Sequence, residues 1–117
     1  MDQKQTPKRM EVYMTNLPHI GGSIQYGYRP VLVIQNDVGN TNSSTTIVVA
    51  LTSKPKRWLP THVTISSACS GLPKKSVALC EQIITLPQSA LENKVGEIKD
   101  EGCIQKIHDA LRISIGI

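Results

Sequence analysis

The sequence predicts one mainly β domain of the α+β class, a small and strongly twisted sheet or partly open barrel with a C-terminal helix packed on it. Three observations support this class. The 117 residues have the length of a single domain. Five or six short β-type segments precede the last, helical pattern. Aromatic residues make up only 3% of the chain and Phe is absent, so Val, Ile, Leu and Ala must build the core.

Alternation and β-branched runs predict five main strands. The first alternates Val12 and Met14 against Tyr13 and Thr15. The second is an apolar run that follows Pro30, a residue that suits the start of a strand. The third, "TTIVVALT", is continuous and β-branched, the fourth alternates as "THVTIS", and the fifth reads "SVALCEQII". The predicted ranges are Glu11–Leu17, Arg29–Gln35, Thr45–Thr52, Thr61–Ser66 and Ser76–Ile84.

The pattern changes after the fifth strand. Thr85 is a candidate N-cap and Pro87 would stand in a first turn, which predicts a short helix over "TLPQSALENK". "VGEI" reads as a short sixth strand. A last helix opens at Lys99 or Asp100, because apolar residues then recur on one face; they are Ile104, Ile107, Leu111 and Ile115.

Polar and glycine-rich segments connect these elements. "PHIGGSIQYGY", between the first two strands, is longer than the usual connection, and loops of this kind are often functional. "NDVGNTNSS" and "ACSGLPKK" read as turns, and "SKPKRWLP" as a basic loop.

Residues 1–9 read as a basic N-terminal tail and residues 10–117 as the domain. The opening "MDQKQTPKRM" is polar and lacks the apolar segment of a signal peptide. No apolar run approaches the roughly 18 residues that cross a bilayer. We therefore expect a cytoplasmic protein that does not enter a membrane.

The cysteines are Cys69, Cys80 and Cys103. Their number is odd and no CxxC pair occurs, whereas zinc ligands usually come in close pairs. We expect reduced, structural thiols and neither a metal nor a cofactor.

Positive charge dominates the first two-thirds of the chain. Between Val12 and Cys80 the only acidic residue is Asp37, whereas the basic residues there are Arg29, Lys54, Lys56, Arg57, Lys74 and Lys75. From Glu81 onward there are six acids and four bases. A basic surface of this kind attracts polyanions such as nucleic acids, but it also serves solubility, and charge alone does not decide between these roles.

Several kinds of catalytic site have no support in the sequence. A two-metal nuclease needs clustered carboxylates, which the basic part of the chain lacks. A histidine pair would need two of three candidates. His108 reads as a surface or satisfied side chain, His62 as structural, and His19, in the long loop, as the best placed for ligand contact. No P-loop or dinucleotide-binding pattern occurs.

Arg29 remains, at the foot of the second strand with no carboxylate near it in sequence. Such a group suits metal-free RNA cleavage. Attack of the 2′-hydroxyl on the adjacent phosphate builds negative charge, and a planar guanidinium can hold two of the oxygens. Thr52 ends the buried run "TIVVAL" and is either the last residue of a strand or a hydroxyl donor beside Arg29. Arginine is a poor proton acceptor, so the sequence assigns no general base.

The segment "KPKRW" joins three charges to the only Trp. Two interpretations stay open for it. The charges contact phosphates while Trp58 stacks on a base, or the loop is solvated and Trp58 packs as a lid.

The segments "RPVLVIQNDVGN", "TIVVALT", "LPTHVTI", "SVALCEQI" and "ALRISIGI" resemble the MazF/PemK toxins of bacterial type II toxin–antitoxin modules, most closely those of Gram-positive bacteria. The resemblance runs from about Lys8 to the C-terminus. It implies an SH3-like barrel of the CcdB/PemK type that forms a homodimer. It also implies a metal-independent, sequence-specific endoribonuclease, or mRNA interferase, that cuts single-stranded RNA and leaves 2′,3′-cyclic phosphate and 5′-hydroxyl ends. A cognate antitoxin would block the groove with an extended, acidic segment.

The resemblance also assigns functional residues. The family's catalytic arginine and threonine fall on Arg29 and Thr52. The family's RNA-contacting positions fall on Ser23, Gln25, Asn36, Leu59, Ser76, Glu81 and Gln82. Tyr28 and Trp58 are further candidate RNA-binding residues, because their rings can stack on bases.

This chain departs from the family pattern in two places. Met10 and Glu11 replace the usual glycine and aspartate before the first strand's aromatic residue. In the long loop, Ile24 replaces an acid and Tyr26 a glycine. Tyrosine adopts positive φ poorly, which favours another loop shape, and loss of the acid removes electrostatic support for Arg29. Altered base preference and weakened activity both stay open, and so do base stacking and antitoxin contact for Tyr26 and Tyr28.

Two other functions remain. The chain is a non-enzymatic binding module on the same barrel, such as a gyrase poison, or a degenerate toxin that only binds its antitoxin. Incubation with long single-stranded RNA in the presence of EDTA separates these from the enzyme.

Overall fold

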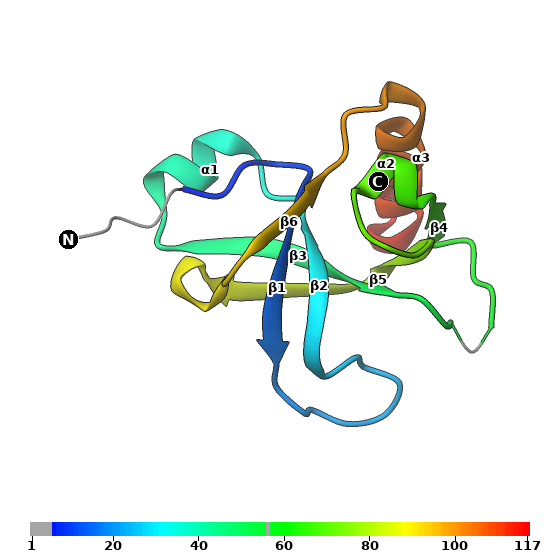
Figure 1. Ribbon diagram of the computed structural model, residues 1–117, viewed down its shortest axis with the longest axis horizontal. Coiled ribbons are helices and arrows are strands. Elements are labelled where there is room, and N and C mark those ends of the chain that lie inside the picture. Colours follow the sequence, from blue (N-terminus) through cyan, green and yellow to red (C-terminus); the bar gives the residue numbers. More distant parts are fainter. Residues whose placement is uncertain (1–5, 56) are drawn as a thin grey trace.

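The computed structural model describes residues 6–55 and 57–117, which form a curled six-stranded antiparallel sheet with a helix at the C-terminal end (Figure 1). The strands are β1 (Glu11–Leu17), β2 (Gly27–Val33), β3 (Thr45–Thr52), β4 (His62–Ile65), β5 (Ser76–Pro87) and β6 (Lys94–Glu97), in the order β4-β5-β3-β2-β1-β6. The helical segments are α1 (Asp37–Asn42), α2 (Ser67–Ser70), the 3₁₀ turn η1 (Gln88–Ala90) and α3 (Glu101–Ile115). The predicted mainly β class with a C-terminal helix is confirmed.

All six predicted strands are present, and β1 and β3 have the predicted bounds. The short helix predicted over "TLPQSALENK" is wrong. Thr85 and Pro87 continue β5 and pair with Ile47 and Thr45 of β3, and only the single turn η1 follows. The pairing partner, β3, is distant in sequence, and pairing with it outweighs the local preference for a helix cap.

Two segments that were predicted as turns contain short helices. Asn36 caps α1 by accepting a hydrogen bond from the backbone N–H of Gly39, and Ser66 caps α2 in the same way through the N–H of Cys69. Asparagine and serine are typical N-cap residues, so the sequence contains a helix-start signal at both places. The many turn-forming residues around them led to the prediction of turns instead.

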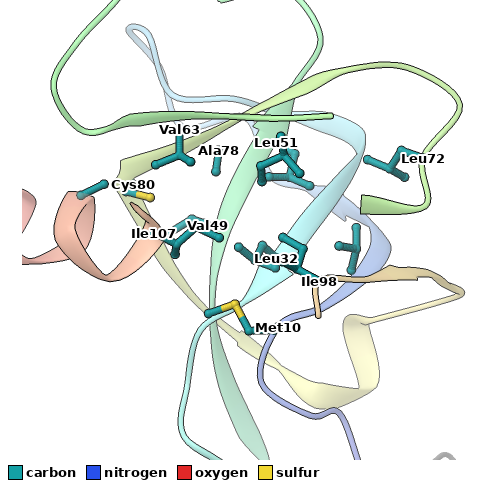
Figure 2. Close-up of a cluster of buried hydrophobic side chains, with 13 residues drawn as sticks. Met10, Leu32, Val49, Leu51, Val63, Leu72, Ala78, Cys80, Ile98 and Ile107 are labelled. Atoms are coloured by element: carbon teal, nitrogen blue, oxygen red, sulfur yellow. The ribbon is translucent and has the colours of Figure 1, made fainter. Parts of the chain in front are cut away.

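The sheet buries apolar side chains on both faces. On one face Leu32, Val49 and Leu51 pack with Ile107 of α3, as the close-up in Figure 2 shows. The cluster on the other face includes Val31, Val33, Val48, Ala50, Val77 and Leu79. Because successive residues of β2 and β3 are buried on opposite faces, these strands read as continuous apolar runs.

Helix α3 begins after Asp100, whose carboxylate accepts from the N–H of Cys103 at 2.8 Å, as predicted for one of the two start residues. The predicted apolar stripe packs only in part. Ile107 is fully buried and Ile104 and Leu111 are half-buried, but Ile115 is 57% exposed. The stripe extends beyond the edge of the sheet that α3 covers.

The three cysteines are free thiols. Burial raises the pKa of Cys80 to about 12 and, with Cys69 beside it, the pKa of Cys103 to about 11, so both remain protonated at neutral pH. Within residues 6–55 and 57–117, no group of three or more His, Cys, Asp or Glu side chains could hold a metal ion. No helix in the same part of the chain is both long and apolar enough to cross a bilayer.

Residues 1–5 of the predicted N-terminal tail lie outside the described residues, but its last residues contact the domain. Pro7 is buried. The backbone N–H of Arg9 donates to the carboxylate of Asp37 at 2.8 Å, and its Nε donates to the carbonyl of Ile34 at 3.1 Å. The end of the tail is therefore attached beside the start of α1.

Gly96 of β6 lies directly against the backbone of Ser70 at the end of α2, so that an added Cβ would overlap the Ser70 carbonyl oxygen. We predict that Gly96→Ala lowers the free energy of unfolding by about 1–3 kcal/mol, as measured by urea denaturation. Gly102→Ala is the matched control. Its Cβ in the first turn of α3 would meet only Oδ2 of the capping Asp100 side chain, at 3.2 Å, so stability should change by less than about 1 kcal/mol. Equal stability of the two variants would contradict the close contact.

Candidate functional site

Arg29 and Thr52 lie at neighbouring ends of β2 and β3. The pairing of β2 with β3 ends at Val31 and Ala50, two residues short of Arg29 and Thr52. Extended by two residues, the same register sets Arg29 opposite Thr52, and opposed residues of antiparallel strands share a face. The two residues therefore lie at the same edge of the sheet, just beyond the paired part of β2 and β3.

Arg29 is half-buried and is not neutralised by a carboxylate. Its Nε donates to the carbonyl of Tyr26 at 2.6 Å. Among the described residues, no acidic oxygen lies within ion-pair distance of the guanidinium. The full positive charge is thus available to an external anion.

The side chain of Thr52 is buried but retains a donor. Its Oγ1 accepts from the backbone N–H of Lys54 at 3.3 Å. A hydroxyl that accepts one hydrogen bond still has its own proton to donate. Thr52 can therefore offer a neutral hydrogen bond next to the charge of Arg29.

A register shift in β5 holds the long loop between β1 and β2. Val49 pairs with Ile83 and Ala50 with Leu79, which leaves residues 80–82 without a partner on β3. The side chain of Gln82 turns to the loop, where its Oε1 accepts from the N–H of Gln25 at 2.9 Å and its Nε2 donates to the carbonyl of Ser23 at 3.0 Å. The side-chain amide of Gln82 thus fixes the middle of this loop with one accepted and one donated hydrogen bond.

The neighbouring Glu81 holds the basic loop before β4. One carboxylate oxygen accepts from Thr61 Oγ1 at 2.8 Å, and the other lies 3.1 Å from His62 Nε2. His62 Nδ1 accepts from the backbone N–H of Leu59, so the ring proton is assigned to Nε2, which donates to Glu81. The ring of Trp58 packs edge-on against His62 at 5.8 Å. His62 is therefore a buried structural residue, as predicted.

Glu81 stays ionised more readily than an ordinary glutamate. Partial burial acts to raise its pKa, but hydrogen bonds from its own backbone, Thr61 and His62 act in the opposite direction, and the net pKa lies below the usual value. The anchor of the basic loop is thus charged over the whole neutral range.

The structure gathers most of the predicted site residues but not all of them. Tyr28 and Trp58 are 54% and 62% exposed, so neither ring is packed as a lid. Ser76 is buried and its Oγ bonds the carbonyl of Lys74 at 3.4 Å. Asn36, in contrast, caps α1 at the opposite end of β2 from Arg29, so one chain does not bring it to the site (Figure 1). Lys56 of the predicted basic loop lies outside the described residues.

The departures of the long loop from the family pattern have a structural explanation. Positive φ values fall on glycines, including Gly27 at 86°, and among the described non-glycine residues only Met10 has one, at 72°. Tyr26 therefore does not take positive φ, and a loop shape that differs from the family pattern stays a prediction. It is Met10, where relatives usually have glycine, that occupies the left-handed region, which costs about 1–2 kcal/mol.

The sequence analysis singled out His19 and Tyr26 separately but not their contact, in which the rings meet edge to face with centroids 4.3 Å apart. It also missed the hydrogen bonds of Thr61 and His62 to Glu81. No local pattern marks these contacts, because the first depends on the shape of the loop and the others join residues about 20 positions apart.

Comparison with solved structures places this fold among bacterial toxins. MazF from Deinococcus radiodurans covers 97% of this chain and 100% of its own, with a TM-score of 0.80 at 21% identity. A mycobacterial endoribonuclease, solved in complex with its cognate antitoxin, covers 95% of this chain and 96% of its own, with a TM-score of 0.79 at 27% identity. The barrel expected from the resemblance is confirmed.

Sequence comparison agrees over nearly the whole chain. Endoribonuclease EndoA of Bacillus subtilis is 45% identical over 111 residues, which are 94% of this chain and 95% of the relative. Endoribonuclease MazF of Staphylococcus saprophyticus is 41% identical, over 94% of this chain and 92% of the relative. The profile of the PemK-like, MazF-like toxins of type II toxin–antitoxin systems matches residues 8–115, and the chain belongs to this family.

We predict that Glu81→Gln reduces the free energy of unfolding at pH 7 by about 1–2 kcal/mol, because it weakens two charge-assisted hydrogen bonds. The carboxylate's contribution is present above its unfolded pKa of about 4.3 and is lost as the pH falls through the lower folded value. Urea unfolding at pH 7 and at pH 3 should therefore show the gap between the variant and the unsubstituted protein closing at low pH. Glu92→Gln is the control, since Glu92 is exposed. If the difference in unfolding free energy between the two proteins were the same at both pH values, the stabilisation would not come from the ionised Glu81 carboxylate.

Proposed function

We propose that this protein is the toxin of a type II toxin–antitoxin module and cleaves single-stranded RNA without a metal ion, in the cytoplasm. The observation that carries the proposal is an arginine without a carboxylate partner among the described residues, held by a backbone carbonyl near the end of β2 that neighbours the end of β3, where Thr52 lies. The names of the relatives support it, because EndoA and MazF are both called endoribonucleases.

Arg29 and Thr52 have complementary roles in the proposed reaction. The ribose 2′-oxygen attacks the adjacent phosphorus and loses its proton to a base, while the bond from phosphorus to the 5′-oxygen breaks and that oxygen takes up a proton. The products are a 2′,3′-cyclic phosphate and a 5′-hydroxyl. Charge on the non-bridging oxygens is greatest midway, where the terminal nitrogens of Arg29 and the hydroxyl of Thr52 stabilise it.

The two anchored loops provide the proposed RNA path. Ser23 and Gln25 lie in the loop that Gln82 holds, and Leu59 lies in the loop that Glu81 and His62 hold. Exposed Tyr28 and Trp58 are the proposed stacking surfaces, since base stacking on aromatic rings is worth about 1–3 kcal/mol per base. The proposed phosphate contacts come from exposed basic residues around them: Lys54, Arg57, Lys74 and Lys75.

An antitoxin is the second proposed partner. A mycobacterial relative was solved with its cognate antitoxin. On this chain, an extended acidic segment would suit the positive charges of Arg29 and the basic loops, and it would exclude RNA by occupying them.

We predict that Arg29→Ala lowers the rate of RNA cleavage by at least about 10²–10³-fold, because it removes the main charge that stabilises the phosphorane-like transition state. The assay is cleavage of a long, defined single-stranded RNA in EDTA, with fragment ends mapped. Arg29→Lys keeps the charge but loses the planar two-oxygen contact, so it should recover only part of the rate. Thermal unfolding should be nearly unchanged in both variants.

The same assay separates the alternatives. Discrete fragments with 5′-hydroxyl ends from the unsubstituted protein support the enzyme, whereas RNA that stays intact supports a binding module or a degenerate toxin. Full activity of Arg29→Ala in EDTA would overturn both the role of Arg29 and the mechanism.

We also propose a homodimer, because apolar side chains remain exposed at the end of the chain. Ile113, Ile115 and Ile117 are 59%, 57% and 82% exposed. A symmetric interface that includes them would remove this surface from water. We predict a dimer in sedimentation velocity and a shift toward monomer in an Ile113→Asp/Ile117→Asp variant. If the two aspartates left the dissociation constant of the dimer unchanged, the interface would not include these residues.

A further inference from the structure

The loop between β1 and β2 has a second attachment, at Tyr26. The ring of Tyr26 meets His19 edge to face, with ring centroids 4.3 Å apart and planes at 81°. The carbonyl of Tyr26 accepts from Arg29 Nε at 2.6 Å. Since the Tyr26 side chain is 51% exposed and His19 is also exposed, burial does not hold this residue, and its contacts must.

These contacts restrict the Tyr26 carbonyl from both sides. On the N-terminal side, Gln82 fixes the backbone at Ser23 and Gln25. On the C-terminal side, Gly27 turns the chain with φ 86° into β2. The ring contact with His19 joins the two ends of the loop, so that the carbonyl is left facing Arg29.

The bond to Nε decides how Arg29 can present its charge. A guanidinium can hold two anion oxygens either through its two terminal nitrogens or through Nε and one terminal nitrogen. Because Nε is already engaged by the Tyr26 carbonyl, only the first mode is open. A neutral carbonyl achieves this orientation without neutralising the positive charge, as a carboxylate would.

We propose that His19 and Tyr26 form a clasp that positions Arg29, with its terminal nitrogens toward the scissile phosphate. The effect of the clasp on catalysis rests on the proposed function, whereas its effect on the position of Arg29 does not. His19 and Tyr26 are positioning residues, because they act through Arg29.

The kinetic test separates positioning from RNA binding. We expect Tyr26→Ala and His19→Ala each to lower kcat for a short RNA substrate by about 10- to 100-fold, with KM changed less than about twofold, because a misplaced group costs rate. Tyr26→Phe keeps the ring and the carbonyl and should restore kcat. The double variant should be no slower than either single variant, since the two rings act as one unit. A raised KM with unchanged kcat would overturn the clasp and identify Tyr26 as a base-stacking surface.

A second measurement needs no RNA. Solvent exchange of the Arg29 Nε proton, followed by 15N NMR, should be slow in the unsubstituted protein and in Tyr26→Phe, and faster in Tyr26→Ala and His19→Ala. Arg9 is the internal control, because its Nε donates to the carbonyl of Ile34 away from the loop and its exchange should not change. Equal Arg29 exchange in all four proteins would overturn the clasp. Intact RNA together with the expected exchange pattern would instead refute the proposed function and leave the clasp standing.

Discussion

The candidate site depends on the register shift between β3 and β5. If the pairing of Val49 with Ile83 continued without interruption, Glu81 and Gln82 would be ordinary residues of a strand. The shift frees residues 80–82 from pairing with β3 and lets two adjacent side chains bond two different loops. One point on β5 thereby holds both loops of the proposed RNA path, and the rigidity of the sheet is transmitted to segments that have little core of their own.

The electrostatics of the site follow a simple division. Among the described residues no carboxylate pairs with Arg29, and the nearby Glu81 is bonded to Thr61 and His62. Arg29 is oriented by a neutral carbonyl. A carboxylate in that place would hold the guanidinium equally well but would compete with the phosphate of a substrate. The arrangement keeps the arginine both ordered and available, which is what stabilisation of a developing anion requires.

The loop next to Arg29 accommodates a tyrosine at position 26 without backbone strain. The positive φ falls on the following Gly27, not on Tyr26. The ring of Tyr26 contacts His19 edge to face. Met10 is the opposite case, since it takes positive φ without being glycine and is retained by burial, with only 5% of its surface exposed.

The sequence by itself determined the strands, the last helix and the residues of the proposed chemistry. Thr45–Thr52 was predicted with its observed bounds because it is buried on both faces and β-branched at six of its eight positions, so that its conformation is encoded locally. Arg29 and Thr52 were identified because their residue types suit the reaction and match the family's motifs. Tertiary structure alone decided that Thr85 and Pro87 extend a strand, that Gln82 and Glu81 anchor loops, and that Tyr26 orients Arg29. The strand extension and the two loop anchors depend on partners far along the chain, and the contact of Tyr26 with Arg29 depends on the shape of the loop between β1 and β2. None of these is visible in local periodicity or capping preference.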